Sequence, residues 1–354
     1  MINSILIYTI TFAISIAFST LYSKTKKKST QLIIIGLSIS IPIFIATYRN
    51  GVGIDYYNYQ KLYHYIIINC TSLNNIFSYY IESGYVILNL LANIIFKNYK
   101  GVLFLSSSIY MIASFKGITN YKTKISVSLA YFIFLVTMYS PFLNGMRQFI
   151  AVAIFFNSYI YIYNRNFWKF FLLVIIASLF HKSALLCLPM YFLWADKGRN
   201  SKVYYILVII ITAIMPLLIP IISNLFTKIG IYNSYFQYNI KVTYGFFLYL
   251  IPILSIFIVT KKYILKEETL QFLLRLYTMQ IPLQLLGNFI GYADRLSLYV
   301  VPSQIILFPY YVKMLNKNKK IIKFFIVAWY IFYYYYMFIF LNSNGVYPYA
   351  FNFN

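Results

Sequence analysis

Three arginines and one histidine stand at the ends of apolar segments, where their side chains could contact an anionic substrate. They are Arg49, Arg147, Arg295 and His181, and each lies on the side opposite the lysine clusters. Lysines and arginines normally gather on the cytoplasmic side of a membrane protein, so these positions depart from that bias. A charge near hydrocarbon usually faces a protein-lined or wet cavity. The pattern predicts an outward-facing cationic pocket that suits an anion such as a lipid-linked diphosphate.

The Arg49 motif follows the second apolar segment directly and reads Arg-Asn-Gly-Val-Gly-Ile-Asp. Gly51 and Gly53 allow a tight backbone path with exposed N–H groups that can bind anions. Arg49 offers a planar fork suited to phosphate, and Asp55 could orient it or accept a proton from a sugar hydroxyl. The alternative is a polar turn in which Arg49 caps a helix and pairs with Asp55.

Two further motifs place polar side chains at turns between apolar segments. Residues 144–148 read Asn-Gly-Met-Arg-Gln; Arg147 and Gln148 at a helix N-terminus fit phosphate or sugar recognition. The alternative is an interfacial arginine that reaches lipid phosphate. His181, in Phe-His-Lys-Ser, can accept a proton from an attacking hydroxyl near neutral pH. Its alternative is a packed, hydrogen-bonded side chain.

The acidic residues are too few and too scattered to predict a metal site. Of the six, Asp55, Glu82 and Asp294 fall in outward segments, and Asp294 directly precedes Arg295 as an anion-site element or a local ion pair. No Asp-x-Asp pair and no His or Cys cluster supplies metal ligands. We therefore expect arginines to neutralise a diphosphate, with no metal and no cofactor. There is no P-loop, dinucleotide glycine motif or serine-nucleophile elbow.

Composition predicts an all-α, polytopic membrane protein. Of the 354 residues, 61% are hydrophobic and only 10% are charged, which excludes an ordinary soluble domain. We expect a single integral membrane domain over residues 1–354. The net charge of +24 lies in short loops, which predicts contact with anionic lipid heads and not with nucleic acid.

The apolar runs predict the order of the transmembrane segments. Candidate spans are 2–22, 31–48, 84–97, 101–116, 125–143, 148–163, 167–181, 183–195, 203–226, 244–260, 272–292, 297–312 and 322–341. The basic loops should be cytoplasmic; they are 24–28, 116–124, 165–169, 197–202, 261–266 and 313–323. Between the outer loop 49–80 and the loop 116–124 the chain must cross an odd number of times, so we favour 84–97 as re-entrant or interfacial. The result is about 12 spans plus that segment.

Taken together, these residues resemble the EpsG-type family of bacterial polysaccharide polymerases, which are Wzy-like proteins. The matching pieces occur in order over residues 40–310: Arg49-x-Gly51-x-Gly53-x-Asp55 with Tyr59, Glu82-x-Gly84-Tyr85, Arg147-Gln148, Phe180-His181-Lys182-Ser183, and Arg295 with Tyr299. The resemblance implies a helical bundle similar to GT-C-type membrane glycosyltransferases. It also implies a multi-pass protein of the bacterial cytoplasmic membrane with its active site on the extracytoplasmic side.

The activity that the resemblance implies is polymerisation of undecaprenyl-diphosphate-linked oligosaccharide repeat units into a capsule, exopolysaccharide or O-antigen. Arg49, Arg147 and Arg295 would contact the diphosphate. His181 is the expected general base, and Asp55 is the second candidate. Further substrate contacts are expected from Gly51, Gly53, Tyr59, Glu82, Tyr85, Gln148, Lys182 and Asp294. Expected partners are the lipid-linked oligosaccharide, membrane lipids and a chain-length regulator.

Three alternative functions fit parts of the sequence, and one of them is a nonenzymatic scaffold in a polysaccharide-export complex. The other two are a transporter and an enzyme. A flippase or transporter of lipid-linked oligosaccharide would also need an outward cationic cavity. It should show repeat symmetry or charges on both sides of the midplane, and neither is visible. A membrane O-acyltransferase would also use a histidine, but it would leave the outward arginines without a purpose.

Overall fold

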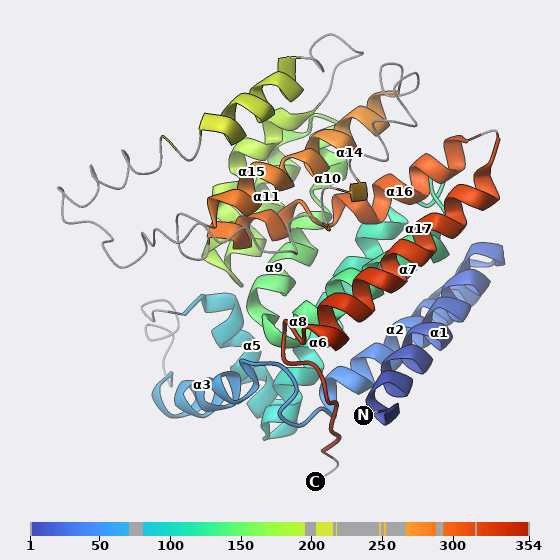
Figure 1. Cartoon of the computed structure of the whole chain (residues 1–354). Helices are drawn as coiled ribbons and strands as arrows, with labels where there is room; N and C mark the ends of the chain where they lie inside the picture. Colours follow the sequence, from blue (N-terminus) through green and yellow to red (C-terminus); the bar gives the residue numbers. More distant parts are fainter. Residues whose placement is uncertain are drawn as a thin grey trace. The chain divides into compact units, whose positions relative to one another are not determined.

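The computed structural model describes residues 2–70, 81–194, 203–214, 217, 248, 251–252, 267–287, 293–315 and 317–352. Helices make up most of these residues (Figure 1). The described residues form no β-strand beyond the isolated bridge between Arg49 and Phe351. The predicted all-α class is therefore confirmed for the described part of the chain.

The chain divides into two compact units. The first comprises Met1–Ser158, Phe171–Leu185 and Phe308–Asn354, and the second comprises Tyr159–Phe170 and Leu186–Leu307. The single membrane domain over the whole chain stays a prediction.

The first unit is built around long helices and the turns that join them. Its elements are α1 (Ile2–Lys24), α2 (Lys28–Thr47), α3 (Tyr56–Asn69), α5 (Ser83–Phe96), α6 (Tyr99–Thr119), α7 (Val127–Phe134), η1 (Leu135–Tyr139), α8 (Ser140–Asn144), α9 (Met146–Phe156), α17 (Lys319–Tyr334) and η4 (Tyr335–Phe340). Helix α2 packs against α1 and α6, and α6 also packs against α5 and α9. This packing holds the ends of α2, α5 and α9 in one region.

Five helical stretches among the described residues are long and apolar enough to cross a membrane. They are Asn3–Lys24, Lys28–Thr47, Tyr99–Thr119, Val127–Asn144 and Lys319–Phe340. They coincide with the predicted spans 2–22, 31–48, 101–116, 125–143 and 322–341. The fourth keeps its length because the π-helical turn η1 continues the helix from α7 into α8.

Other predicted spans form shorter elements. Helix α5 has 14 residues, which rise about 21 Å and so fall short of ~30 Å of hydrocarbon. That length is compatible with the re-entrant or interfacial role predicted for 84–97. The predicted span 148–163 is divided into α9 and α10 (Tyr159–Tyr163). The hairpin around His181 consists of α11 (Phe167–Ser178) and the 3₁₀-helix η2 (Lys182–Leu193), both with residues in the two units.

The second unit comprises the chain from Leu186 to Leu307 together with Tyr159–Phe170. Its described elements include α10, the helix Val203–Ile214, α14 (Glu268–Thr278), α15 (Gln280–Leu286) and η3 (Ala293–Tyr299). Helix α16 (Ser303–Met314) has residues in both units. Residues 215–216 and 218–226 of the predicted span 203–226 lie outside the described residues, and so does most of the span 244–260. The same holds for residues 288–292, the outer loop 227–242 and the basic loops 197–202 and 261–266. The total of about 12 membrane-spanning segments therefore remains a prediction.

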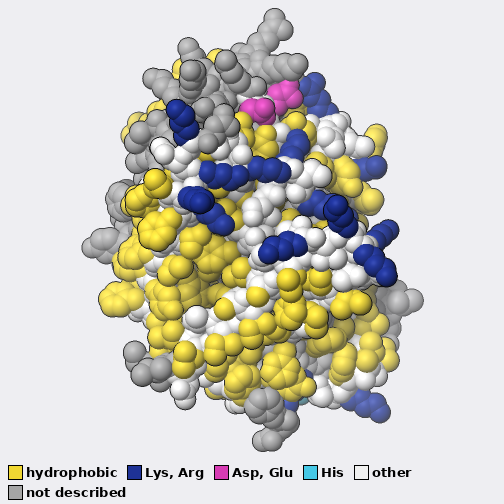
Figure 2. All heavy atoms as spheres, turned by 90° about the vertical axis from the view of Figure 1, so that its right-hand side faces the viewer, with side chains coloured by type: hydrophobic (Ala, Val, Ile, Leu, Met, Phe, Trp, Pro, Cys, Tyr) yellow, Lys and Arg dark blue, Asp and Glu magenta, His cyan; other side chains and the backbone are white. Residues whose placement is uncertain are grey.

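Three of the predicted basic loops belong to the first unit. The loop 24–28 joins α1 to α2, 116–124 joins α6 to α7, and 313–323 precedes and begins α17. The last two meet, because Lys313 Nζ donates to the Thr123 carbonyl. On the face in Figure 2, most Lys and Arg side chains lie in the upper half, others lie at the lower edge, and hydrophobic side chains cover a broad zone between them. The larger group on one side of that zone fits a membrane protein whose basic loops share one side.

Two elements near the candidate site were not predicted. Helix α3 lies within the predicted outer loop 49–80, where its many tyrosines and polar residues break any apolar run. The segment 341–352 folds back along the Arg49 motif. The Asn50 N–H donates to the Ala350 carbonyl at 2.9 Å, and the Asn352 N–H donates to the Tyr48 carbonyl at 2.7 Å. These contacts hold the Arg49 motif from its far side.

Candidate active site

Arg49 follows α2 and is buried, with 1% of its surface exposed. Its Nη2 donates to Met146 Sδ at 3.3 Å, and its Cζ lies 5.9 Å from the centre of the Tyr56 ring. The Tyr99 hydroxyl also lies beside the guanidinium. Neither Nε nor Nη1 makes a hydrogen bond of good geometry with a described residue. Within the described ranges, no carboxylate forms an ion pair with it, so the alternative in which Arg49 pairs with Asp55 is wrong for this structure.

A buried cation with no anionic partner is energetically costly. The structure provides Arg49 with a sulfur atom and aromatic rings instead of a carboxylate. An anionic ligand would supply the missing charge and accept hydrogen bonds from the two unsatisfied nitrogens.

Gly53 brings the Arg49 motif against the turn that precedes Arg147. Its φ is +98°, and a Cβ at this position would meet the Leu143 carbonyl oxygen at 2.5 Å. Its N–H donates to the Gly345 carbonyl at 2.8 Å. Because the Gly53 N–H is already hydrogen-bonded, the role that the structure shows for Gly53 is to let the Arg49 motif pack closely against the neighbouring turn. Gly51 also has positive φ, at +64°.

We expect Gly53→Ala to destabilise the first unit. Alanine would have to adopt an unfavourable φ and push against backbone, at a cost of about 1–3 kcal/mol. The matched control is Gly36→Ala on α2, where an added Cβ meets no atom within 4 Å. Thermal unfolding of the detergent-solubilised variants should give a lower Tm for Gly53→Ala than for Gly36→Ala. Equal Tm values would contradict the close approach to Leu143.

Asp55 connects the same two turns through its backbone. Its N–H donates to Asn144 Oδ1 at 3.0 Å, and its carboxylate Oδ1 accepts from Asn58 Nδ2 at 3.1 Å. The side chain is half-buried at the start of α3. Asp55 therefore lies near the Arg147 turn with a carboxylate that solvent can reach.

Arg147 opens α9 and forms an ion pair with Glu82. The Nη1–Oε2 distance is 2.8 Å, and the side chains are 29% and 10% exposed, respectively. The other carboxylate oxygen of Glu82 accepts the Lys182 N–H at 3.1 Å. One carboxylate thus connects the Arg147 turn to the His181 turn. The Lys182 side chain itself is exposed.

Two tyrosines flank the Arg147 guanidinium. Its Cζ lies 5.9 Å from the centre of the Tyr85 ring, and the rings of Tyr85 and Tyr59 pack edge to face with centroids 5.9 Å apart. Burial raises the pKa of Tyr59, although the adjacent Arg147 acts in the opposite direction. The Tyr59 hydroxyl therefore stays protonated at neutral pH and can donate a hydrogen bond. Gln148 is buried beside Arg147 on α9.

Gly84 brings the start of α5 against the end of α11. Its N–H donates to the Leu179 carbonyl at 2.8 Å, and a Cβ there would meet that oxygen at 2.7 Å. Glu82 is two residues before Gly84, and His181 is two residues after Leu179. This close approach explains how Glu82 reaches the His181 turn.

His181 is half-buried, with its ring oriented by Ser183. Its Nδ1 lies 2.7 Å from Ser183 Oγ and 3.4 Å from the Ser183 backbone nitrogen. A backbone N–H can only donate, so this contact favours Nδ1 as an acceptor with the proton on Nε2. In the other tautomer Nδ1–H donates to Ser183 Oγ, and Nε2 becomes the atom that can accept a proton.

The first unit therefore brings together three of the predicted turns. Arg49 and Asp55 connect the Arg49 motif to the Arg147 turn through Met146 and Asn144. Glu82 contacts Arg147 and the Lys182 N–H, so it connects the Arg147 turn to the His181 turn. The predicted residues joined in this way are Arg49, Gly51, Gly53, Asp55, Tyr59, Glu82, Tyr85, Arg147, Gln148, His181 and Lys182. Their catalytic and binding roles are proposals, which the contacts make possible.

Asp294 and Arg295 lie on η3 of the second unit. The Asp294 carbonyl accepts from Ser297 Oγ at 2.6 Å, and the Arg295 side chain is exposed. Their convergence with the Arg49 and Arg147 turns stays a prediction.

Sequence reasoning missed a buried arginine in the second unit. Arg275, on α14, is 6% exposed; its Nη1 donates to the Trp194 carbonyl at 2.9 Å, and its Cζ lies 5.3 Å from the centre of the Tyr204 ring. The sequence does place Arg275 inside the predicted apolar span 272–292. A charged residue in such a span usually faces protein, so this position could have indicated a buried arginine.

The described residues contain no group of three or more His, Cys, Asp or Glu side chains that could hold a metal ion. Among the described residues of the site, the groups that could bind an anion are therefore the cationic side chains.

The sequence model of a known family, described as the EpsG family, matches residues 32–351. The chain belongs to the EpsG family. EpsG proteins are a family of polysaccharide polymerases, and the match covers the Arg49, Arg147 and His181 turns. No curated protein and no solved structure matches the chain. With its apolar helices, this EpsG-family member is an integral membrane protein of the polysaccharide-polymerase type.

Proposed function

We propose that this EpsG-family protein joins undecaprenyl-diphosphate-linked oligosaccharide repeat units on the outer face of the bacterial cytoplasmic membrane. The donor is the growing chain on its lipid diphosphate, and the acceptor is a sugar hydroxyl of a new lipid-linked unit. The bond between the anomeric carbon and the phosphate oxygen breaks, and a bond from that carbon to the acceptor oxygen forms. The acceptor proton leaves with a base, and the lipid diphosphate departs as an anion.

The observation that carries this proposal is the buried Arg49, with two unsatisfied nitrogens and no anionic partner among the described residues. A membrane protein retains such a group at a cost, which function explains better than stability does. A diphosphate supplies both the charge and the acceptors that the guanidinium requires.

Arg147 and Tyr59 would assist at the same leaving group. Glu82 holds Arg147 at the start of α9, while the neutral Tyr59 hydroxyl offers a further donor. Preorganised donors of this kind stabilise charge that develops in a transition state, and they do so without a metal ion. In the second unit, Arg295 and Asp294 would contribute if the two units bring them to the diphosphate.

His181 would accept the proton of the acceptor hydroxyl. The Ser183 N–H contact favours the proton on Nε2, so this role requires the other tautomer, in which Nδ1 carries the proton and Ser183 Oγ accepts its hydrogen bond. Nε2 is then able to remove a proton from a hydroxyl within hydrogen-bond reach. Asp55 remains the second candidate for the base.

The direction of the helices supports the outward location proposed for the site. Helix α2 begins at the basic loop 24–28 and ends before Arg49, and the helix of α7, η1 and α8 begins after the basic loop 116–124 and ends before Arg147. If these basic loops are cytoplasmic, both arginines lie at the outer ends. We also propose that the chain crosses the membrane about 12 times and that α5 is re-entrant. The resulting helical bundle would be similar to those of GT-C enzymes.

Reconstitution separates the polymerase from its alternatives. Proteoliposomes would receive lipid-linked repeat units extracted from cells that lack this polymerase. The expected result is a ladder of longer oligosaccharides together with free lipid diphosphate. Movement of the lipid across the bilayer without a change in length would instead identify a flippase, and acyl transfer to the sugar would identify an O-acyltransferase.

We expect Arg49→Met to impair activity while sparing stability. Loss of one preorganised donor to the diphosphate should reduce ladder formation by about 10²-fold. The Tm should stay the same or rise, because methionine fills similar space without a buried unpaired charge. Lys61→Met, an exposed cation on α3, is the control that should retain full activity. A strong fall in Tm for Arg49→Met, with activity restored by lysine, would assign Arg49 a structural role.

A further inference from the structure

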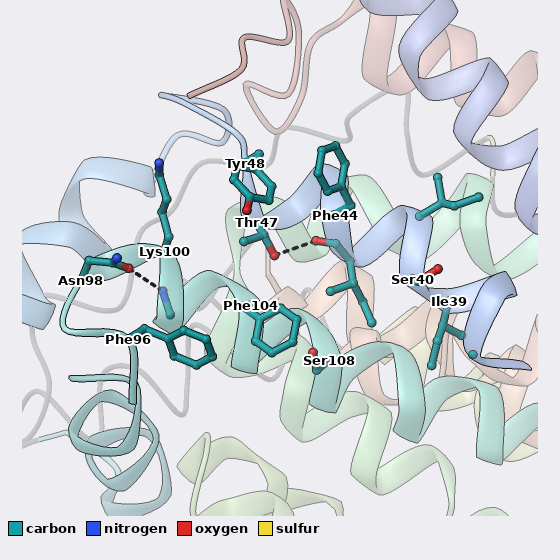
Figure 3. Close-up of a pocket in the computed structure, with 14 residues that line it drawn as sticks. Ile39, Ser40, Phe44, Thr47, Tyr48, Phe96, Asn98, Lys100, Phe104 and Ser108 are labelled. Atoms are coloured by element: carbon teal, nitrogen blue, oxygen red, sulfur yellow. Dashed lines mark hydrogen bonds between the residues drawn. The ribbon is translucent and has the colours of Figure 1, made fainter. Parts of the chain in front are cut away.

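A groove of about 820 Å³ runs between α2 and α6 of the first unit (Figure 3). Much of its wall is aliphatic or aromatic, from residues such as Ile39, Phe44 and Phe104. Figure 3 shows Lys100, Asn98 and Tyr48 together at one end, away from Ile39 and Ser40 at the other. The groove therefore combines a long apolar part with one cationic, polar end.

The polar end coincides with the ends of two candidate membrane-spanning helices. Helix α2 ends at Thr47, α6 begins at Tyr99, and the apolar part extends back to Gly36 on α2. The stretch from Gly36 to Thr47 rises about 16 Å, roughly half of a ~30 Å hydrocarbon core. In a membrane, the groove would thus span the depth of one leaflet, with Lys100 near the surface.

Two glycines shape the groove. A Cβ added at Gly36 would meet no atom within 4 Å, so this glycine borders empty space. At the other end, a Cβ on Gly101 would meet Phe96 Cβ at 2.7 Å. Gly101 therefore lets the Phe96 ring pack closely and form part of the wall.

The polar end adjoins the candidate active site along the chain. Tyr48 lines the groove and directly precedes Arg49, and the Lys100 Nζ lies 5.7 Å from the centre of the Tyr48 ring. A ligand with an apolar tail in the groove would therefore have its head beside Lys100 and close to the Arg49 motif. This arrangement suits a long apolar chain joined to an anionic head.

We propose that the α2–α6 groove binds the isoprenoid chain of the lipid diphosphate substrate, with Lys100 contacting its phosphates. The inference rests on the proposed function, because it takes the donor or acceptor lipid as the occupant. An ordinary bilayer phospholipid shares the same general chemistry. The position of the polar end next to the Arg49 motif favours the substrate lipid.

Direct binding tests the groove separately from catalysis. The probe is a polyprenyl diphosphate that carries a photoreactive group on its isoprenoid chain, presented to the protein in phosphatidylcholine proteoliposomes. We expect labelling of peptides from α2 and α6. Gly36→Leu should fill the groove from α2 and raise the Kd at least tenfold. The control Ile33→Phe, on an exposed position of α2 outside the groove, should change the Kd by less than twofold.

Two further variants complete the design. Ser108→Leu fills the groove from α6 and replaces Gly36→Leu as the test if that variant does not fold. Lys100→Ala should raise the Kd for the diphosphate about tenfold and leave the affinity for the uncharged polyprenol unchanged. That difference would assign Lys100 to the phosphates.

The outcomes distinguish this inference from the proposed function. If the wild type forms a ladder while the folded groove-filling variant binds the probe normally, the groove inference is wrong and the polymerase proposal stands. If these variants weaken binding but the wild type forms no ladder, the groove inference stands and the polymerase proposal is wrong. Displacement of the probe by an equal mole fraction of phosphatidylglycerol would overturn the inference in favour of a bilayer-lipid site.

Discussion

Replacement of His181 by alanine is expected to slow repeat-unit transfer by about 10²–10⁴-fold, the usual contribution of a general base. The protein should stay folded and inserted, because the ring is half-buried and not part of the core. The measurement is the rate of ladder formation in proteoliposomes that contain equal amounts of each protein. Protonated imidazole cannot accept a proton, so the wild-type rate should also fall as the pH decreases. The alanine variant should lack that acidic limb.

Two matched variants define what the His181 result means. His64→Ala removes the only other histidine, an exposed side chain on α3, and should leave the rate unchanged. Ser183→Ala removes only the hydroxyl that orients the ring, so the rate should fall by about tenfold, which corresponds to the loss of one hydrogen bond. Full activity of His181→Ala would exclude this residue as the base and would move that role to Asp55.

Replacement of Arg147 by alanine is the second change for which we expect a near-complete loss of polymer, about 10³-fold. This substitution removes a donor to the leaving diphosphate. It also leaves the Glu82 carboxylate without its ion-pair partner at a mostly buried position. Stability should therefore fall as well, and the activity result alone would not separate catalysis from folding.

The double variant Arg147→Ala/Glu82→Gln separates the two effects. Glutamine keeps the shape of Glu82 and can still accept the Lys182 N–H, but it carries no charge. The Tm of the double variant should recover toward that of the wild type, while the transfer rate should stay low. Recovery of the rate together with the Tm would show that Arg147 serves only to neutralise Glu82.

Much of the helical framework could be predicted from the sequence because membrane insertion depends on local properties. A run of about 20 apolar residues must satisfy its backbone hydrogen bonds internally, and a helix does so wherever that run occurs. The long helices α1, α2, α6 and α17, and the helix formed by α7, η1 and α8, accordingly lie at their predicted positions. The same reasoning missed α3, since its tyrosine-rich sequence forms no apolar run.

The candidate site was predicted as a list of residues, and only the tertiary structure decided which of them meet. The substrate contact expected of Glu82 stays a prediction, and the structure adds that its carboxylate holds Arg147 and the His181 turn. Arg49 was given Asp55 as an alternative partner, yet it contacts Met146 instead.

The physical reason is that these contacts depend on backbones that approach each other closely across long stretches of chain. Gly53 against Leu143 and Gly84 against Leu179 permit that approach, since a side chain at either glycine would collide with a carbonyl oxygen. A sequence shows that a glycine is present, but it does not show which distant carbonyl lies against it. The residue types that can bind a diphosphate were therefore evident from the sequence alone, while their assembly around α9 was determined by packing.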